Sequence, residues 1–276
     1  MNELLETELY HLINGRHGRF LANPQDMYMG RSMIKYGEFS EIEWHLLGQL
    51  VRPGAVVIEA GANMGTFTVP LAKNAGRQGM VYAFEPQLSV FQQLCANIAL
   101  NDLVNVQAFN AGCGEESDWM KIVRPDPARE LNFGGLALQK LKGESLAKVR
   151  VEKLDDAIDP PRLTLLKADV EGMELEVLKG ADGLIRQHRP ILYLECHEDE
   201  APGLIHHTRE LDYDLWWHLP AMYNPNNHTG DPENIFGRIT SKNMLCAPKE
   251  KNMTVNGARQ IEGEDDHPSK WAAKQS

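Results

Sequence analysis

The sequence predicts an α/β protein with a doubly wound, mostly parallel sheet that carries helices on both faces. Candidate strands alternate with candidate helices from residue 55 to residue 211, an order typical of a parallel sheet. The clearest strand, Ala55–Ile58, is a continuous apolar run rich in valine and isoleucine, as expected for a strand that is covered on both sides. A turn with two glycines follows this strand and leads into a helical segment.

The first fifty residues are expected to form an N-terminal extension, residues 1–39, and one helix. Residues 1–18 have the pattern of a short amphipathic helix, and residues 19–37 mix apolar pieces with turn residues, which indicates a small hairpin. A helical pattern then runs to Leu50, with Ser40 as the candidate N-cap.

The remaining elements follow from apolar runs that are bounded by turn residues. Strands are expected at Ala55–Ile58, Val81–Phe84, Val104–Phe109, Leu163–Ala168, Ile191–Glu195, Tyr213–Leu219 and Lys242–Ala247. Helices are expected at Thr66–Asn74, Ser89–Asn101, Met173–Gln187 and Gly203–Leu211. Residues 115–148 are expected to be irregular. The main domain is expected to span residues 40–248, and the polar residues 249–276 to form a mobile tail.

Composition argues against several classes of protein. The 276 residues suffice for one large domain or two small ones. A net charge of −11 disfavours nucleic-acid binding, because phosphate contacts need clustered lysines and arginines. No apolar run approaches the roughly 18 residues that a membrane span requires, and the N-terminus does not resemble a signal peptide. The four cysteines form no C-x-x-C pair, so we expect reduced, mostly buried thiols in a cytoplasmic protein.

The turn after the first strand, Glu59–Gly65, is the first candidate ligand site. Glycine lets a ligand approach the backbone, and the next helix offers free N–H groups. A dinucleotide-binding turn would carry three glycines here, whereas this chain has Gly61, Gly65 and an acid at the strand end. Because Glu59 would repel a pyrophosphate, the turn favours a cationic ligand. The fold is expected to tolerate Gly61→Val while ligand binding falls.

Glu85, at the end of the second strand, is the second candidate. An acid about two dozen residues beyond a glycine turn usually binds ribose, because a carboxylate accepts hydrogen bonds from both hydroxyls of the diol. The turn and Glu85 together predict an adenosyl ligand.

The fourth strand is followed by Asp169, Glu171 and Glu174. In a parallel sheet the carboxyl ends of the strands form the ligand crevice, so Asp169 is expected to face it. For Glu171 a favourable interaction with the dipole of the next helix is the alternative role. For Glu174 the alternative is a solvated position on the helix surface.

Histidines follow the next two strands, in Glu195-Cys196-His197-Glu198 and in Trp216-Trp217-His218. Histidine suits general-base catalysis near neutral pH. Together with Asp and Glu it also suits a divalent metal, although the chain carries no metal-binding signature. One of the two tryptophans is expected in the core, and the other is expected to be exposed as a lid or a sugar-stacking residue.

Three stretches resemble the FkbM family of S-adenosylmethionine-dependent methyltransferases: Val57–Ala72, Tyr82–Pro86 and Ala168–Ala181. The resemblance extends over roughly residues 30–248 and includes a G-x-N-x-G turn and a D-x-E-G-x-E element. It implies a class I methyltransferase fold, whose seven-stranded sheet ends in a hairpin with one antiparallel strand. The family more commonly has Asp at position 59, and Asn-Asp-like residues at positions 196–198.

The resemblance implies O-methylation of a small molecule or carbohydrate, with a sugar hydroxyl favoured. The cofactor residues would be Glu59, Gly61, Asn63, Gly65, Glu85, Ala111 and Asp169. The catalytic candidates are Asp169, Glu171, His197 and His218. A divalent metal and a homo-oligomer remain open. The alternatives are an NAD(P)-dependent oxidoreductase and a non-catalytic binding protein of the same fold.

Overall fold

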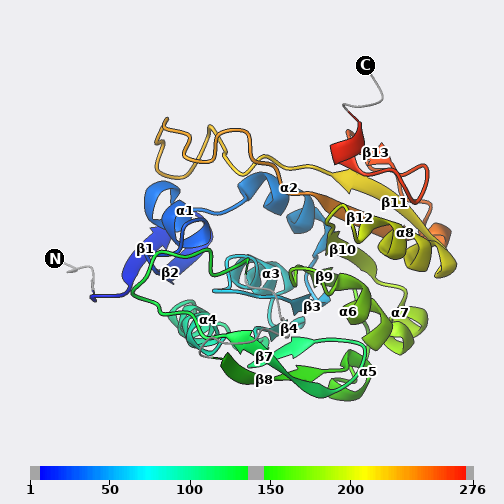
Figure 1. The fold of residues 1–276 in the computed structure, drawn as a ribbon, viewed down its shortest axis with the longest axis horizontal. Helices are drawn as coiled ribbons and strands as arrows, with labels where there is room; N and C mark the ends of the chain where they lie inside the picture. The colour runs from blue at the N-terminus through cyan, green and yellow to red at the C-terminus, as the bar shows by residue number, and fades with distance from the viewer. Residues whose placement is uncertain (1–6, 136–145, 272–276) are drawn as a thin grey trace.

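The computed structural model describes residues 7–135 and 146–271. Its largest sheet has eight strands in the order β13-β11-β12-β10-β9-β3-β4-β5 (Figure 1). In chain order these are β3 Val56–Ala60, β4 Met80–Phe84, β5 Val106–Phe109, β9 Leu165–Ala168, β10 Ile191–Glu195, β11 Tyr213–His218, β12 Asn243–Pro248 and β13 Arg259–Gln260. Strands β5, β4, β3, β9 and β10 are parallel, and β12 is antiparallel to both β10 and β11. This order confirms the expected class I methyltransferase sheet, to which β13 adds a short eighth strand.

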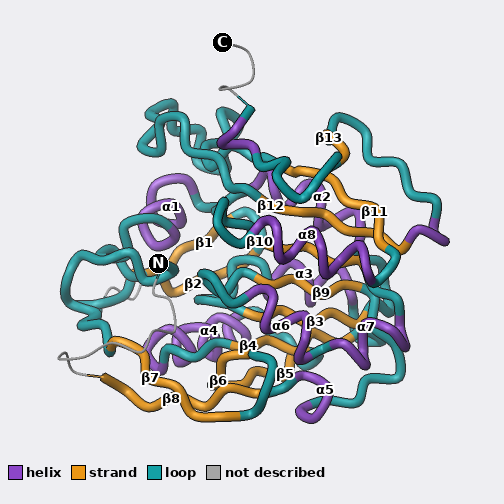
Figure 2. Tube along the Cα trace, turned by 45° about the vertical axis from the view of Figure 1, so that its right-hand side comes forward, coloured by secondary structure: helices purple, strands orange, loops and turns teal. Residues whose placement is uncertain are grey.

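Helices cover both faces of the sheet, because successive residues of its buried strands face opposite layers. One layer contains α2 Glu41–Leu50, α3 Thr68–Ala75 and α4 Leu88–Leu100, which share an apolar cluster with Val57. The other contains α5 Leu154–Ala157, α6 Glu174–Gly180, α7 Asp182–His188 and α8 Ala201–Glu210, which pack with Val56 and Ile58 (Figure 2). Within the described residues, no helix combines the length and the apolar character that a membrane crossing requires.

The N-terminal extension differs from the prediction. The hairpin is formed by β1 His11–Gly15 and β2 Gly18–Ala22, and a helix, α1 Met29–Tyr36, follows it. The expected helix over residues 1–18 is therefore wrong for residues 11–18, while residues 1–6 lie outside the described residues. The two-residue turn Arg16-His17, which lies between the paired glycines Gly15 and Gly18, closes the hairpin and outweighs the helical spacing of the nearby leucines.

The described parts of two segments that were expected to be irregular or mobile are ordered, whereas residues 136–145 and 272–276 of these segments lie outside the described residues. Residues 115–148 contribute β7 Asp118–Val123 and the start of β8 Leu146–Glu152, which form a small sheet with β6 Ala111–Cys113. Both β7 and β8 are partly exposed and contain several charged residues, so neither shows the continuous apolar run by which the other strands were predicted. Beyond Pro248 the chain forms the short helices η1 Lys249–Lys251 and η2 Pro268–Lys270. Strand β13 pairs with β11, and His267 is fully buried, so this segment packs against the sheet.

The expected helix Met173–Gln187 is divided into α6 and α7 at Ala181. Gly180 passes so close to the chain at Gly114 that a Cβ atom there would lie 2.0 Å from the Gly114 carbonyl oxygen. The prediction that the cysteines are unpaired and mostly buried is confirmed, since all four thiols are free and three of them are buried.

The turn after β3 requires glycine at position 61 because of its backbone conformation and its packing, not because a ligand needs the space. Gly61 has a φ of 82°, and a Cβ atom there would lie 1.9 Å from the carbonyl oxygen of Asp169. A side chain at Gly61 would therefore collide with the neighbouring loop. The expectation that Gly61→Val leaves the fold intact is wrong for this reason.

We predict that Gly61→Ala lowers the free energy of unfolding by about 3 kcal/mol or more, through backbone strain and overpacking. Gly257→Ala is the matched control, because Gly257 has a similar φ of 78° and nothing within 4 Å of the added Cβ. It should cost only about 1–2 kcal/mol of backbone strain. Urea unfolding measures both, and equal losses would contradict the assigned contact between Gly61 and Asp169.

Candidate active site

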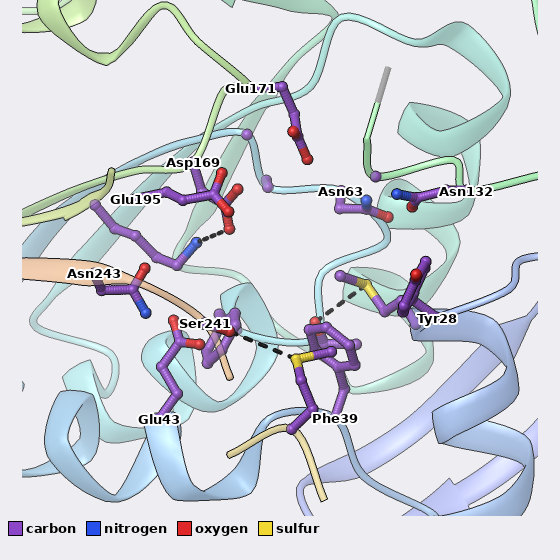
Figure 3. A pocket seen from close by; sticks show the side chains of 18 of the residues that line it. Tyr28, Phe39, Glu43, Asn63, Asn132, Asp169, Glu171, Glu195, Ser241 and Asn243 are labelled. Atoms are coloured by element: carbon purple, nitrogen blue, oxygen red, sulfur yellow. Dashed lines mark hydrogen bonds and ion pairs between the residues drawn. The ribbon is translucent and has the colours of Figure 1, made fainter. Parts of the chain in front are cut away.

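A cavity of about 240 Å³ opens at the carboxyl ends of β3, β4, β9 and β10. Figure 3 shows Asp169 and Glu195 on one side of it, with Asn63, Asn132 and Tyr28 on the other. Segments far from the glycine turn complete the wall. They supply Asp26, Tyr28, Met29, Phe39 and Glu43 before the sheet, and Met222, Ile239, Thr240, Ser241 and Asn243 from the connection into β12.

Glu85 lies in the wall of this cavity beside the glycine turn, at the place expected from the sequence. Its Oε2 atom accepts a hydrogen bond from the backbone N–H of Asn63 at 3.0 Å, and its Oε1 atom accepts one from Gln87 at 2.7 Å. Burial raises the pKa of Glu85 to about 7, against the lowering effect of those two donors. Each carboxylate oxygen keeps a further lone pair for a ligand.

Lys167 is the main site residue that sequence reasoning missed. Its side chain is 2% exposed, and the strand register places it between Glu59 of β3 and Tyr193 of β10. The Nζ atom lies 3.2 Å from Oδ2 of Asp169 and 4.9 Å from the ring centroid of Phe67. Burial alone would lower the pKa of Lys167, but Asp169, Glu59 and Glu43 together raise it above its usual value.

Two further buried carboxyls face this lysine. Glu59 accepts a hydrogen bond from Oγ1 of Thr68 at 2.6 Å, and Glu43 accepts one from Oγ of Ser40 at 2.9 Å. Burial raises the pKa of both glutamates to about 7, and the charge of Lys167 opposes that rise. Ser40 stands at the N-cap position of α2 as predicted, but its hydroxyl binds Glu43 instead of capping the helix. Glu59 lies outside the cavity lining, so it supports the site from the sheet.

A second acidic group lies at the same edge of the sheet. Glu171 and Glu195 both line the cavity, and His197 stands beside them with 46% of its side chain exposed. Burial and the charge of Asp169 raise the pKa of Glu171 to about 7, and burial together with the charges of Asp169 and Glu171 raises the pKa of Glu195 well above its usual value. Glu171, Glu195 and His197 offer ligand atoms that all lie within 4.8 Å of one another, and so they can hold a metal ion.

Three other residues that were predicted at the site, Glu174, Gly65 and Ala111, do not line the cavity. Glu174 is fully buried and accepts hydrogen bonds from the backbone N–H groups of Val170 and Gly172, at 2.7 and 3.2 Å. Burial raises the pKa of Glu174 to about 8. Its solvated alternative is therefore wrong, and its contacts hold the loop that carries Glu171. Gly65 and Ala111 lie outside the cavity lining.

The residues at the end of β11 do not line the cavity. Nδ1 of His218 is 2.7 Å from the hydroxyl of Tyr193, outside the cavity lining, and burial lowers the pKa of this histidine. Trp216 and Trp217 are both buried, and the indole N–H of Trp217 donates to the Asp266 carbonyl. The expectation that one of them is exposed is wrong, because the segment after Pro248 covers this strand.

One protein family matches more than half of the chain. The profile described as "Methyltransferase FkbM domain" matches residues 59–215. The chain is 30% identical to "Methyltransferase sdnD" of Sordaria araneosa, over 46% of this chain and 60% of that protein. It is 29% identical to "Methyltransferase 1" of Beauveria bassiana, over 46% of this chain and 58% of that one. The chain therefore spans about three fifths of the length of these curated relatives.

A solved structure, the methyltransferase FkbM from Methylobacillus flagellatus, is similar with a TM-score of 0.46 and 19% identity. The match covers 80% of this chain and 55% of that structure. The family profile begins at the end of β3 and ends within β11. It therefore includes the glycine turn, Glu85 and Asp169, and it leaves out the cavity segments around Tyr28 and Ser241.

We predict that Lys167→Met lowers the free energy of unfolding by about 3–5 kcal/mol at pH 8, because buried carboxylates lose their cation. Without the lysine, Glu43 and Glu59 take up protons in the folded state at a higher pH than in the unfolded state. The loss should therefore shrink between pH 8 and pH 5.

The control for this prediction is Lys179→Met, which removes an exposed pair with Glu115 at 3.3 Å. It should cost less than about 1 kcal/mol at either pH. Urea titrations at the two pH values measure both variants. A loss in Lys167→Met that is small, or that does not depend on pH, would show that the buried carboxyls do not rely on this ammonium.

Proposed function

The chain belongs to the FkbM methyltransferase family, and from this premise we propose that it transfers a methyl group from S-adenosylmethionine to an acceptor in the cavity. The observation that carries the proposal is the joint position of Glu85, the Gly61–Asn63 turn and Asp169 around one cavity. This arrangement offers a diol-binding carboxylate and a negatively charged wall within the reach of one ligand.

The charge of the cavity suits the cofactor. Six of its described lining residues are acidic and one, Lys167, is basic. The sulfonium of S-adenosylmethionine is a cation, which the ionised carboxyls of this lining attract, whereas the same ionised groups repel the pyrophosphate of a dinucleotide. The lining therefore disfavours the NAD(P)-dependent alternative. In our assignment Glu85 accepts hydrogen bonds from the ribose hydroxyls, and the backbone at Gly61 passes along the rest of the cofactor.

The acceptor we favour is a hydroxyl of a small molecule or carbohydrate. Amide and hydroxyl side chains in the wall, among them Asn132, Ser241 and Asn243, can bind the hydroxyls of a sugar, and Tyr28 and Phe39 add aromatic surface. Tyr28, Phe39 and Ser241 belong to segments that the family profile does not cover. We therefore assign the choice of acceptor to those segments.

The reaction is an in-line displacement at the methyl carbon. The acceptor oxygen forms a bond to that carbon while the carbon–sulfur bond breaks, and S-adenosylhomocysteine leaves as a neutral thioether. Alignment of the two reactants supplies much of the rate. The hydroxyl proton must pass to a base. Asp169 is the residue we assign, because it lines the cavity and Lys167 holds one of its oxygens at 3.2 Å. His197 lies outside the lining.

Equilibrium binding tests the cofactor assignment. Isothermal calorimetry of the full chain should show binding of S-adenosylhomocysteine and no comparable binding of NAD⁺ or NADP⁺. Tight binding of a nicotinamide dinucleotide in place of S-adenosylhomocysteine would instead favour the oxidoreductase alternative.

We predict that affinity for S-adenosylhomocysteine rises with pH, because the ribose donates to the ionised form of Glu85. With a pKa of about 7 in the free protein, affinity should increase by up to about tenfold per unit below pH 7 and level off above it. The Glu85→Gln variant should bind at least about tenfold more weakly at pH 8, since charge-assisted hydrogen bonds contribute about 1.5–3 kcal/mol each.

The variant also isolates Glu85 from the other titrating carboxyls. Glu43, Glu59 and Glu171 remain in Glu85→Gln, so only the part of the pH dependence that belongs to Glu85 should disappear. Identical calorimetric pH profiles in the two proteins would exclude Glu85 as the ribose ligand.

A further inference from the structure

Two glutamates and a histidine stand together at the mouth of the cavity, and the proposed methyl transfer does not use them. Glu171 lies in the loop after β9, Glu195 ends β10, and His197 follows two residues later. The Nε2 atom of His197 lies 3.7 Å from Oε2 of Glu171 and 3.6 Å from Oε2 of Glu195. One ring nitrogen therefore faces both carboxylates.

These distances are too long for hydrogen bonds and fit a shared ion. An N–H···O hydrogen bond spans about 2.7–3.2 Å. A metal ion with bonds of about 2.0–2.2 Å keeps its ligand atoms about 3–4.4 Å apart, from neighbouring to opposite positions. Both separations from Nε2 of His197 fall inside that interval. The ligand atoms of all three side chains also lie within 4.8 Å of one another, so the group can surround a common centre.

A second observation is the state of Glu195. Its Oε2 atom is buried and has no hydrogen-bond partner among the described residues, while the side chain as a whole is 23% exposed and contacts the carboxyl of Asp169. A buried oxygen without a partner destabilises the protein by about 1–3 kcal/mol, and more when it is charged. Within the part of the chain that the structure describes, no lysine or arginine forms an ion pair with Glu171 or Glu195. The nearby cation, Lys167, is paired with Asp169. No lysine or arginine among the described residues therefore neutralises these two carboxyls.

A second histidine between two glutamates shows how an ordinary surface cluster differs. Nδ1 of His206 lies 3.0 Å from Glu264, while its Nε2 lies 3.4 Å from Glu210. The carboxylates contact opposite nitrogens of the ring, so they cannot share one ion with it. All three side chains are more than half exposed. This cluster also consists of one histidine and two glutamates, but its carboxylates do not approach the same ring nitrogen.

We propose that Glu171, Glu195 and His197 bind one divalent metal ion at the mouth of the cavity, beside Asp169. Two carboxylates and one imidazole suit Mn²⁺, and Mg²⁺ more weakly because of the nitrogen ligand. An ion there would bind an acceptor oxygen and favour loss of its proton, as a Lewis acid does. That last role rests on the proposed methyl transfer, whereas the site itself does not.

The test is a titration of the full-length chain with Mn²⁺, followed by electron paramagnetic resonance, without cofactor or acceptor. We expect one equivalent of bound Mn²⁺. Glu195→Gln and His197→Ala should each weaken binding at least tenfold, with Glu171→Gln as a third variant. His206→Ala should bind like the unchanged protein. Pulsed spectra should show the ¹⁴N signal of an imidazole ligand, and His197→Ala should lack it.

Thermal unfolding of each variant without metal shows whether it folds. Mn²⁺ that stays free at millimolar concentrations would overturn the proposal, as would bound Mn²⁺ with unchanged affinity in folded Glu195→Gln and His197→Ala. The readout needs no methyl transfer. Loss of Mn²⁺ in these variants with no methyltransferase activity in the parent would refute the proposed function alone. Transfer by a protein that binds no Mn²⁺ would refute the metal site alone.

Discussion

The ion pair between Lys167 and Asp169 is the interaction on which the site depends. A lysine that is 2% exposed would be costly in an apolar core, and it is stable here because carboxyls converge on it from three directions. The strand register places Glu59 beside it, α2 places Glu43 opposite it, and Asp169 follows it in the chain. The contact with Lys167 also holds Asp169 at the cavity. The same ion pair therefore stabilises the centre of the sheet and positions the proposed base.

The cavity combines a part that lies inside the family profile with a part that lies outside it. The glycine turn, Glu85 and Asp169 lie inside the span that matches the FkbM family, and they are the residues we assign to the cofactor and the chemistry. The segments around Tyr28 and Ser241 lie outside that span and close the opposite wall. The cavity also has two groups of carboxyls, which differ in the basic residues beside them. Lys167 compensates the carboxyls at the sheet, while Glu171 and Glu195 face no lysine or arginine among the described residues, only His197, and we assign a metal ion there.

Much of the fold could be predicted, because buried strands such as Ala55–Ile58 and turn residues such as Gly61 give strong local signals. The same holds for Glu85 and Asp169, which end their strands. Lys167 was not predicted, since its partners come from β3 and α2 and only the register brings them together. A lysine inside an apolar strand is nevertheless an unusual feature that marks the place. The segment after Pro248 was misjudged because its few buried side chains, His267 among them, are scattered between charged residues.

The central claim is that the cavity transfers a methyl group from S-adenosylmethionine. The most direct test supplies methyl-labelled S-adenosylmethionine and a small-molecule extract to the protein and to Asp169→Asn, and follows the label by mass spectrometry. We expect labelled acceptor and S-adenosylhomocysteine in equal amounts. In Asp169→Asn the rate should fall by about 10²–10⁴-fold, the usual contribution of a general base, and S-adenosylhomocysteine should still bind. Full activity in that variant, or oxidation of a nicotinamide cofactor with no label transferred, would contradict the account.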